Sequence, residues 1–145
     1  LAYHRIPITA EDAPDPGDFD AIRRILRHHP NQAIVFNCQM GIGRSTTCAV
    51  IASAILMNDT VLPPASSTAL SEVSQHYRII HSLLRMLPEG TRCKEQIDRL
   101  IDQAASVVNL RQVTEECRQQ AEQAHDPGVR RRALQRGVAY LKRYT

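Results

Sequence analysis

The chain has 145 residues, a mass of 16.3 kDa and 43% hydrophobic residues, enough for the core of one globular domain. Its net charge of +3 permits an anionic ligand without requiring nucleic acid, and two Phe, four Tyr and no Trp offer little surface on which unpaired bases could stack. Within the chain, no run of about 18 apolar residues predicts a membrane span, and no secretory signal pattern is found.

The first half of the chain alternates predicted strands and helices. Residues 1–8 and 33–36 are predicted to be strands, the second of them buried, because it is rich in β-branched and aromatic side chains. Asp18 is the expected N-cap of a helix that ends near His28–Pro30, and residues 46–57, which lack Gly and Pro, predict a buried helix. This order predicts an α/β fold with a partly parallel sheet and flanking helices, whose ligand site lies at the carboxyl ends of the strands.

The second half is predicted to be helical. Residues 60–71, rich in Pro, Ser and Thr, are expected to form a loop. Helical periodicity then recurs in residues 72–87, 91–108 and 109–125, and a last helix is expected to begin at Asp126–Gly128. We expect residues 72–145 to form a helical bundle packed on the sheet, within a single domain that comprises residues 1–145.

Between the second predicted strand and its helix lies the stretch 37–45, Asn-Cys-Gln-Met-Gly-Ile-Gly-Arg-Ser. A loop of successive backbone N–H groups that ends in a helix N-terminus is a binding site for phosphate. Gly41 and Gly43 are expected to provide positive φ angles and close backbone approach. The positive electrostatic field of these N–H groups and of the helix N-terminus also lowers the pKa of a cysteine, which makes Cys38 the candidate nucleophile.

The other loop residues have predicted roles around that sulfur. Arg44 offers a planar fork for two phosphate oxygens, and Ser45 places a hydroxyl in the first helical turn, near the sulfur. The candidate substrate-binding residues are Gln39, Met40, Gly41, Ile42, Gly43 and Arg44. Gln39, Met40 and Ile42 add no positive charge to the rim, so the loop alone does not choose the substrate.

Three other interpretations of the loop fit less well. A dinucleotide fingerprint would need its third glycine at Thr46, and a Walker-type loop would need Gly-Lys-Ser/Thr with a different preceding spacing. Cys38 could also be one more small buried residue of the core, as many free cysteines are. The combination of strand, two glycines, arginine, serine and helix at these spacings favours the phosphate-binding interpretation.

The pattern Cys-x5-Arg-Ser after a predicted strand resembles the signature of the protein tyrosine phosphatase superfamily of cysteine phosphatases. The flanking stretches Tyr3–Thr9 and Phe36–Gly41 are similar to those of the paladin family and of the related phytase-like cysteine phosphatases. The similarity continues in Ala13–Pro14, Asp18–Asp20, Leu83–Leu87, Lys94–Asp102 and Asn109–Arg111. It implies a cysteine phosphatase-like fold with further strands upstream, so we expect this chain to be the C-terminal part of a larger domain.

The resemblance also implies a general acid. In phytase-like relatives, an aspartate directly after an Ile-Thr pair protonates the leaving oxygen and later activates water. Here Ile8-Thr9 is followed by Ala10, so Glu11 or Asp12 would have to replace that acid. Each of these two carboxylates could equally be a solvated loop charge.

The cysteines and the basic residues outside the loop indicate no further chemistry. Cys38, Cys48, Cys93 and Cys117 lack the spacing of a zinc site or a disulfide framework, so we expect no metal or other cofactor and a reducing, cytoplasmic location. Cations from Arg130 to Arg143 are spread around a helix axis, which is typical of a solvated face. His76, Arg78 and Lys94 are the candidates for contacts at the rim of the site.

The leading hypothesis is a phosphomonoesterase that acts through a Cys38 thiophosphate. The resemblance favours inositol polyphosphates or phosphoinositides over phosphotyrosine. One alternative is a phosphotyrosine protein phosphatase, and another, motivated by Ala10, is a phosphate-binding pseudophosphatase or the regulatory domain of a tandem-repeat protein. The expected partners are a phosphorylated small molecule or a phosphoprotein, not nucleic acid, and the full-length chain is expected to contain a further phosphatase-like domain.

Overall fold

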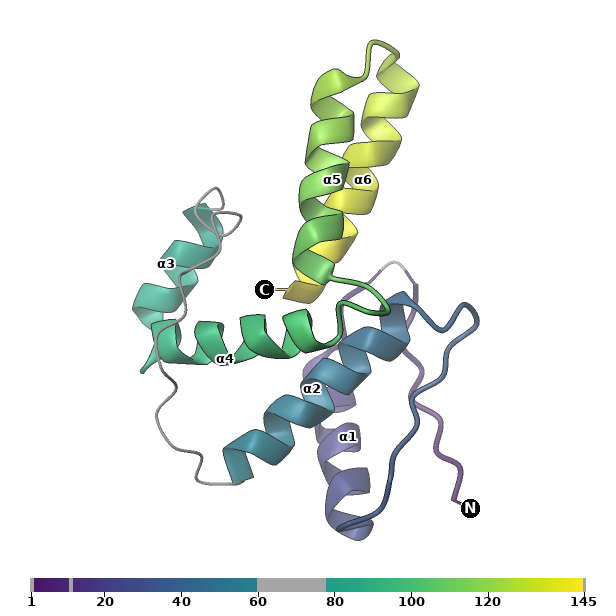
Figure 1. Cartoon of the computed structure of the whole chain (residues 1–145), viewed down its shortest axis with the longest axis vertical. Coiled ribbons are helices and arrows are strands. Elements are labelled where there is room, and N and C mark those ends of the chain that lie inside the picture. The colour runs from purple at the N-terminus through teal and green to yellow at the C-terminus, as the bar shows by residue number, and fades with distance from the viewer. Residues whose placement is uncertain (1, 11, 60–77, 145) are drawn as a thin grey trace.

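The computed structural model describes residues 2–10, 12–59 and 78–144. Within them the chain forms six helices: α1 (Pro16–His28), α2 (Gly43–Asp59), α3 (Arg78–Met86), α4 (Gly90–Gln103), α5 (Leu110–Gln123) and α6 (Pro127–Tyr144). Figure 1 shows α1, α2 and α4 layered across the lower part of the molecule, with the α5–α6 hairpin projecting from them. None of these helices is long and apolar enough to cross a membrane.

The predicted partly parallel sheet is wrong, since no β-strand forms within the described residues. A strand requires a ladder of backbone hydrogen bonds to a neighbouring strand. Among the described residues 2–8 of the predicted first strand, the backbone hydrogen bond that forms is local, from Ile8 N to Ile6 O at 3.0 Å. The alternation of apolar residues nevertheless has a structural role, because the following side chains pack on the core of α1 and α2: Ile6, Ile8, Ile34 and Phe36.

The predicted second strand is also not buried on both sides. Val35, between two packed side chains, is 88% exposed. A short apolar run identifies the residues that face a core, but it does not reveal whether a partner strand is present. The described fold is therefore helical, with two non-helical segments lying against one face of it.

The start of α1 also differs from the prediction. Asp15, not Asp18, is its N-cap: the Asp15 carboxylate accepts a bond from Asp18 N at 2.9 Å, and the Asp18 carboxylate accepts one from Asp15 N at 3.0 Å. This reciprocal pair is a capping box, and Pro16 occupies the first turn, where proline is favoured. The buried Ile22 and Leu26 then hold α1 against α2.

The helical C-terminal half follows the sequence pattern more closely. Asn109 caps α5 by accepting bonds from two backbone amides, and Asp126 Oδ1 accepts from Val129 N at 2.8 Å at the start of α6. The predicted helix over 72–87 is seen as α3 from residue 78 onward, and the predicted loop over 60–71 lies outside the described residues. The predicted helix over 91–108 is shorter than expected, ending at Gln103.

A buried ion cluster joins α4, α5 and the end of α6. Asp98 pairs with Lys94 on α4 and lies 3.2 Å from Arg111 on α5. Tyr144, near the end of α6, donates its hydroxyl to the other oxygen of Asp98 at 2.8 Å. Asp102 pairs with Arg111 as well. Since two carboxylates balance two cations, the cluster is neutral, and it fixes the C-terminal end of α6 against α4.

Candidate functional site

The stretch 37–45 forms a turn that leads directly into α2. Gly41 N donates to Cys38 O at 3.1 Å, and Gly41 has φ of 68°, a conformation that favours glycine. The helix begins at Gly43, so Arg44 and Ser45 lie in its first turn. Positive φ was expected at both glycines, but Gly43 does not have it. The missing Cβ of Gly43 instead leaves room for the Arg143 guanidinium.

The Cys38 thiol lies in a polar environment that favours its anion. Its pKa is lowered to about 6, first by the hydroxyl of Ser45 and then by the backbone amides of Ser45, Met40 and Gly41, while partial burial opposes the shift. Donors aimed at a sulfur stabilise the thiolate relative to the thiol. At neutral pH the Cys38 side chain is therefore mostly the nucleophilic thiolate.

The Ser45 hydroxyl has the largest single effect on the pKa of the Cys38 thiol. Its residue is 8% exposed, and its Oγ makes no hydrogen bond of standard geometry with the described residues. The neighbouring hydroxyls differ, because Thr46 and Thr47 bond to the carbonyls of Ile42 and Gly43 at 2.6 and 2.9 Å. The Ser45 hydroxyl alone therefore keeps its proton available for the sulfur beside it.

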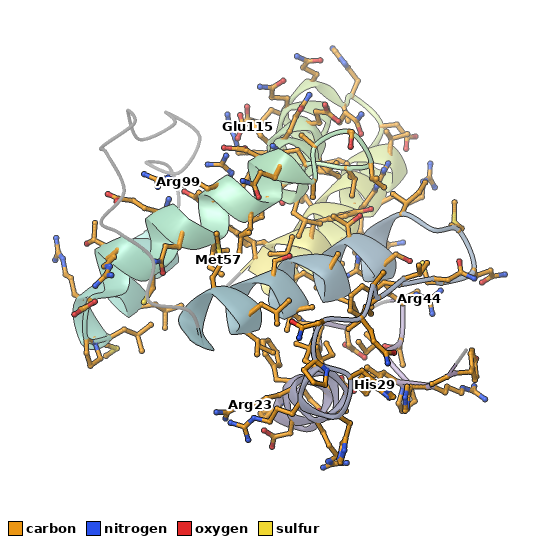
Figure 2. The ribbon with its side chains drawn as sticks, turned by 60° about the horizontal axis from the view of Figure 1, so that its bottom comes forward. Arg23, His29, Arg44, Met57, Arg99 and Glu115 are labelled. Atoms are coloured by element: carbon orange, nitrogen blue, oxygen red, sulfur yellow. The ribbon has the colours of Figure 1, made fainter. Side chains whose placement is uncertain are left out.

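Arg44 is half-buried at the start of α2 and reaches the N-terminal segment. Its Nη1 donates to Ile8 O at 3.3 Å. Figure 2 shows Arg44 at the loop end of α2, beside the extended N-terminal chain. A guanidinium carries further N–H donors that this one bond does not use. Gln39 and Met40 are exposed at the tip of the loop, and Met40 is 77% exposed.

The structure brings the predicted acid segment close to the loop, but it does not place an acid on the sulfur. The bond from Arg44 to Ile8 fixes the start of this segment. Asp12 is exposed, and its carboxylate accepts from Thr9 Oγ1 at 3.1 Å. Glu11 lies outside the described residues. No carboxylate is among the groups that set the pKa of Cys38.

Arg143 is a residue of the site that the sequence interpretation placed on a solvated face. It is half-buried, and its Nη2 donates to Ala10 O, in the acid segment. Its Nη1 would lie only 2.9 Å from a Cβ at position 43, so the guanidinium rests against Gly43. Helical spacing could not reveal this contact, because it depends on how α6 docks on the first half of the chain.

The other cations and cysteines fall elsewhere. Lys94 is buried and paired with Asp98, so its charge is already balanced and it is not a rim residue, while the side chains of His76 and Arg78 lie outside the described residues. All four cysteines are free, and burial raises the pKa of Cys48 to about 11. No group of three metal-ligating side chains occurs among the described residues.

An apolar cavity of about 510 Å³ lies near the loop without including it. Side chains of α1, α2, α4, α5 and α6 line it, among them Thr47, Ile101 and Arg143. None of residues 37–45 contributes to it. The N-terminal end of α2, next to Cys38, is therefore separate from the apolar cavity beside the middle of the same helix.

Comparisons with known proteins agree with these features. The family model for phytases similar to protein tyrosine phosphatases, described by the words inositol hexakisphosphate, matches residues 1–56. The chain is 32% identical to paladin of Homo sapiens, with 98% of this chain aligned, and 30% identical to paladin of Gallus gallus, with 99% aligned. Paladin of Danio rerio is 29% identical over 83% of the chain.

These alignments cover 19%, 18% and 16% of the three paladins, so the chain spans less than a fifth of the length of the curated relatives it matches. No solved structure matches the chain significantly. The matched residues 1–56 contain the Cys38 loop, the segment before it and most of α2. The chain therefore belongs to the paladin and phytase-like branch of the protein tyrosine phosphatase superfamily.

Proposed function

We propose that this chain carries a cysteine-dependent phosphomonoesterase site whose nucleophile is Cys38. The observation that carries the proposal is the lowered pKa of the Cys38 thiol, at the N-terminus of α2 and beside the otherwise unpartnered Ser45 hydroxyl. A structural cysteine in an apolar core has a raised pKa, as Cys48 does in this same chain. The contrast between these two thiols supports a chemical role for Cys38.

The proposed reaction has two steps. The Cys38 thiolate attacks phosphorus, the bond from phosphorus to the leaving oxygen breaks, and that oxygen takes a proton from Glu11 or Asp12. The leaving oxygen keeps the electron pair of the broken bond, and only the proton comes from the acid. Water then attacks phosphorus and gives its proton to the same carboxylate, while the bond from phosphorus to sulfur breaks and its electron pair stays on sulfur as the thiolate. The amides of residues 39–44 and the Arg44 guanidinium hold the phosphoryl oxygens through both steps.

The proposed substrates are inositol polyphosphates or phosphoinositide head groups, in a reducing, cytoplasmic setting. The description of the matching family, inositol hexakisphosphate, supports this class over phosphotyrosine. The exposure of the site suits both inositol phosphates and phosphotyrosine, because Cys38 is half-buried and its loop is exposed at Gln39 and Met40. A phosphotyrosine peptide is therefore the comparison substrate in the test.

The test is phosphate release from inositol hexakisphosphate, a phosphoinositide and a phosphotyrosine peptide. Turnover by the wild-type chain that Cys38→Ser abolishes and Cys48→Ser leaves intact supports the proposal. Glu11→Gln and Asp12→Asn identify the acid by the loss of turnover on substrates with poor leaving groups. Absence of turnover on all three substrates by a folded wild-type chain would refute the enzymatic proposal.

A specific observation favours a second candidate, a phosphate-binding pseudophosphatase. The backbone of Ala10, at the position of the family's acid, is bonded to Arg143, and the Asp12 carboxylate is bonded to Thr9. Protection of Cys38 from alkylation by inorganic phosphate, without any turnover, supports this candidate. A large rise in turnover on Ala10→Asp instead shows that only the missing acid limited the enzyme.

A further inference from the structure

Two arginines from distant parts of the chain hold the segment that precedes the candidate acids. Arg44, in the first turn of α2, donates to Ile8 O at 3.3 Å. Arg143, near the end of α6, donates to Ala10 O. The two bonded carbonyls are only two residues apart, so the backbone of this short segment is held at both ends against the start of α2.

The Arg143 guanidinium occupies a defined place. Its Cζ lies 5.2 Å from the centre of the Tyr140 ring, one turn earlier on α6, and its Nη1 rests against the Cα of Gly43. A Cβ at position 43 would lie 2.9 Å from Nη1 and 3.7 Å from the Tyr140 hydroxyl. Gly43 is thus the residue that admits the guanidinium to the loop, and this is the use of its missing side chain.

The end of α6 is itself anchored. Tyr144, the residue after Arg143, donates to the buried Asp98 at 2.8 Å, and Asp98 is held by Lys94 and Arg111. Burial and the bond to Asp98 raise the pKa of the Tyr144 hydroxyl, so it stays a donor throughout the physiological range. The buried ion cluster therefore sets where Arg143 stands.

We infer that Arg143 is a positioning residue that latches residues 8–10 onto the phosphate-binding loop, so that the α5–α6 hairpin sets where Asp12, which is bonded to Thr9, lies relative to Cys38. The latch is a statement about structure, and its catalytic meaning rests on the proposed function. Direct binding of a second phosphate by Arg143 is disfavoured, because its Nη2 already donates to Ala10 O and its side chain is half-buried beside Gly43.

Hydrogen exchange measured by mass spectrometry tests the latch without any need for activity. In Arg143→Gln, we expect faster exchange in the peptide of residues 8–12 at the Ile8 amide, whose N–H donates to Ile6 O at 3.0 Å, since a charge-assisted bond that restrains this backbone is lost. Arg143→Lys should restore part of the protection. Arg136→Gln is the matched control, because Arg136 also faces the Tyr140 ring, at 5.9 Å, whereas the bonds to the carbonyls of Ile8 and Ala10 come from Arg44 and Arg143.

A second variant protects the test against a general loss of structure. Gly43→Ala should displace the Arg143 guanidinium, so its effect on exchange in residues 8–12 should be similar to that of Arg143→Gln, and the double variant should show no further increase. Exchange across α5 should stay as in the wild type. Unchanged exchange of residues 8–12 in Arg143→Gln would overturn the latch.

Turnover on inositol hexakisphosphate then tests the catalytic meaning. We expect Arg143→Gln to lower kcat roughly tenfold with KM nearly unchanged, because proton delivery suffers and phosphate binding does not. A raised KM at constant kcat would overturn the positioning role in favour of substrate contact. If the wild type has no turnover, the proposed enzymatic function fails, whereas the exchange result still decides whether the latch exists.

Discussion

Replacing Ser45 by alanine removes the strongest influence on the pKa of the Cys38 thiol. The wild-type pKa of about 6 lies well below the ordinary value of 9.0. With a pKa of about 6, roughly nine-tenths of the thiol is ionised at pH 7. A hydrogen bond to a charged group contributes about 1.5–3 kcal/mol, so its loss should raise the midpoint of ionisation by roughly one to two pH units. The thiolate fraction at pH 7 then falls to between about a half and a tenth.

The assay is the rate of alkylation by iodoacetamide between pH 5 and 10, followed peptide by peptide with mass spectrometry. Cys93 is exposed and provides an internal reference thiol in every sample, whereas Cys48 is buried and should react slowly. Thr47→Val is the matched control, because it removes a hydroxyl from the same helical turn that bonds Gly43 O rather than the sulfur.

The expected result is an order of pH midpoints for the alkylation of Cys38. This midpoint should lie near pH 6 in the wild type and in Thr47→Val, and higher in Ser45→Ala. If Ser45→Ala leaves the midpoint unchanged, the serine is not the main donor to the sulfur. If the wild-type midpoint lies near that of an ordinary thiol, the whole electrostatic description of the loop is wrong.

Two further predictions concern the scaffold, and both are measured by urea unfolding. Gly41→Val should destabilise the chain by about 1–2 kcal/mol through the positive φ of this position alone, since no atom lies within 4 Å of the new Cβ. Gly41→Asn should cost less, because asparagine tolerates positive φ better than valine does. Equal losses of stability in the two variants would contradict the backbone explanation. Asp98→Ala should cost about 3–5 kcal/mol, because Lys94 is left buried without its carboxylate and Arg111 keeps only Asp102 of its two partners. Glu89→Ala, which breaks an exposed ion pair, should cost little, and similar losses for both variants would show that the buried cluster contributes no more than a surface pair.

The turn at residues 37–45 and the helix that follows it could be predicted from the sequence because the information for them is local. The apolar run before Cys38, the glycine at position 41 and the helix-forming residues after Arg44 are all within a few residues of one another. The sheet could not be predicted in the same way, since pairing requires a partner strand and an apolar run such as 33–36 does not specify one. The side chains of Ile34 and Phe36 in this run pack on α1 and α2 instead.

Two other differences have physical reasons of the same kind. Asp15 and Asp18 are both suitable N-caps, and the capping box uses both, so only Pro16 in the first turn indicated the earlier start. Arg143 was missed because its partner, Ala10, lies 133 positions away in sequence, and helical spacing describes only the local face of a helix. Contacts made by docking of the α5–α6 hairpin are invisible to such patterns.

Trapping the phosphoryl group on sulfur would test the proposed Cys38 thiophosphate directly. The chain would be mixed with radiolabelled inositol hexakisphosphate, quenched within one turnover and digested, and the label located by peptide. Label is expected on the peptide that contains Cys38, both in the wild type and in Cys48→Ser, and should be absent in Cys38→Ser. Label found on another residue, or none at all while the chain still releases phosphate, would contradict the proposed thiophosphate.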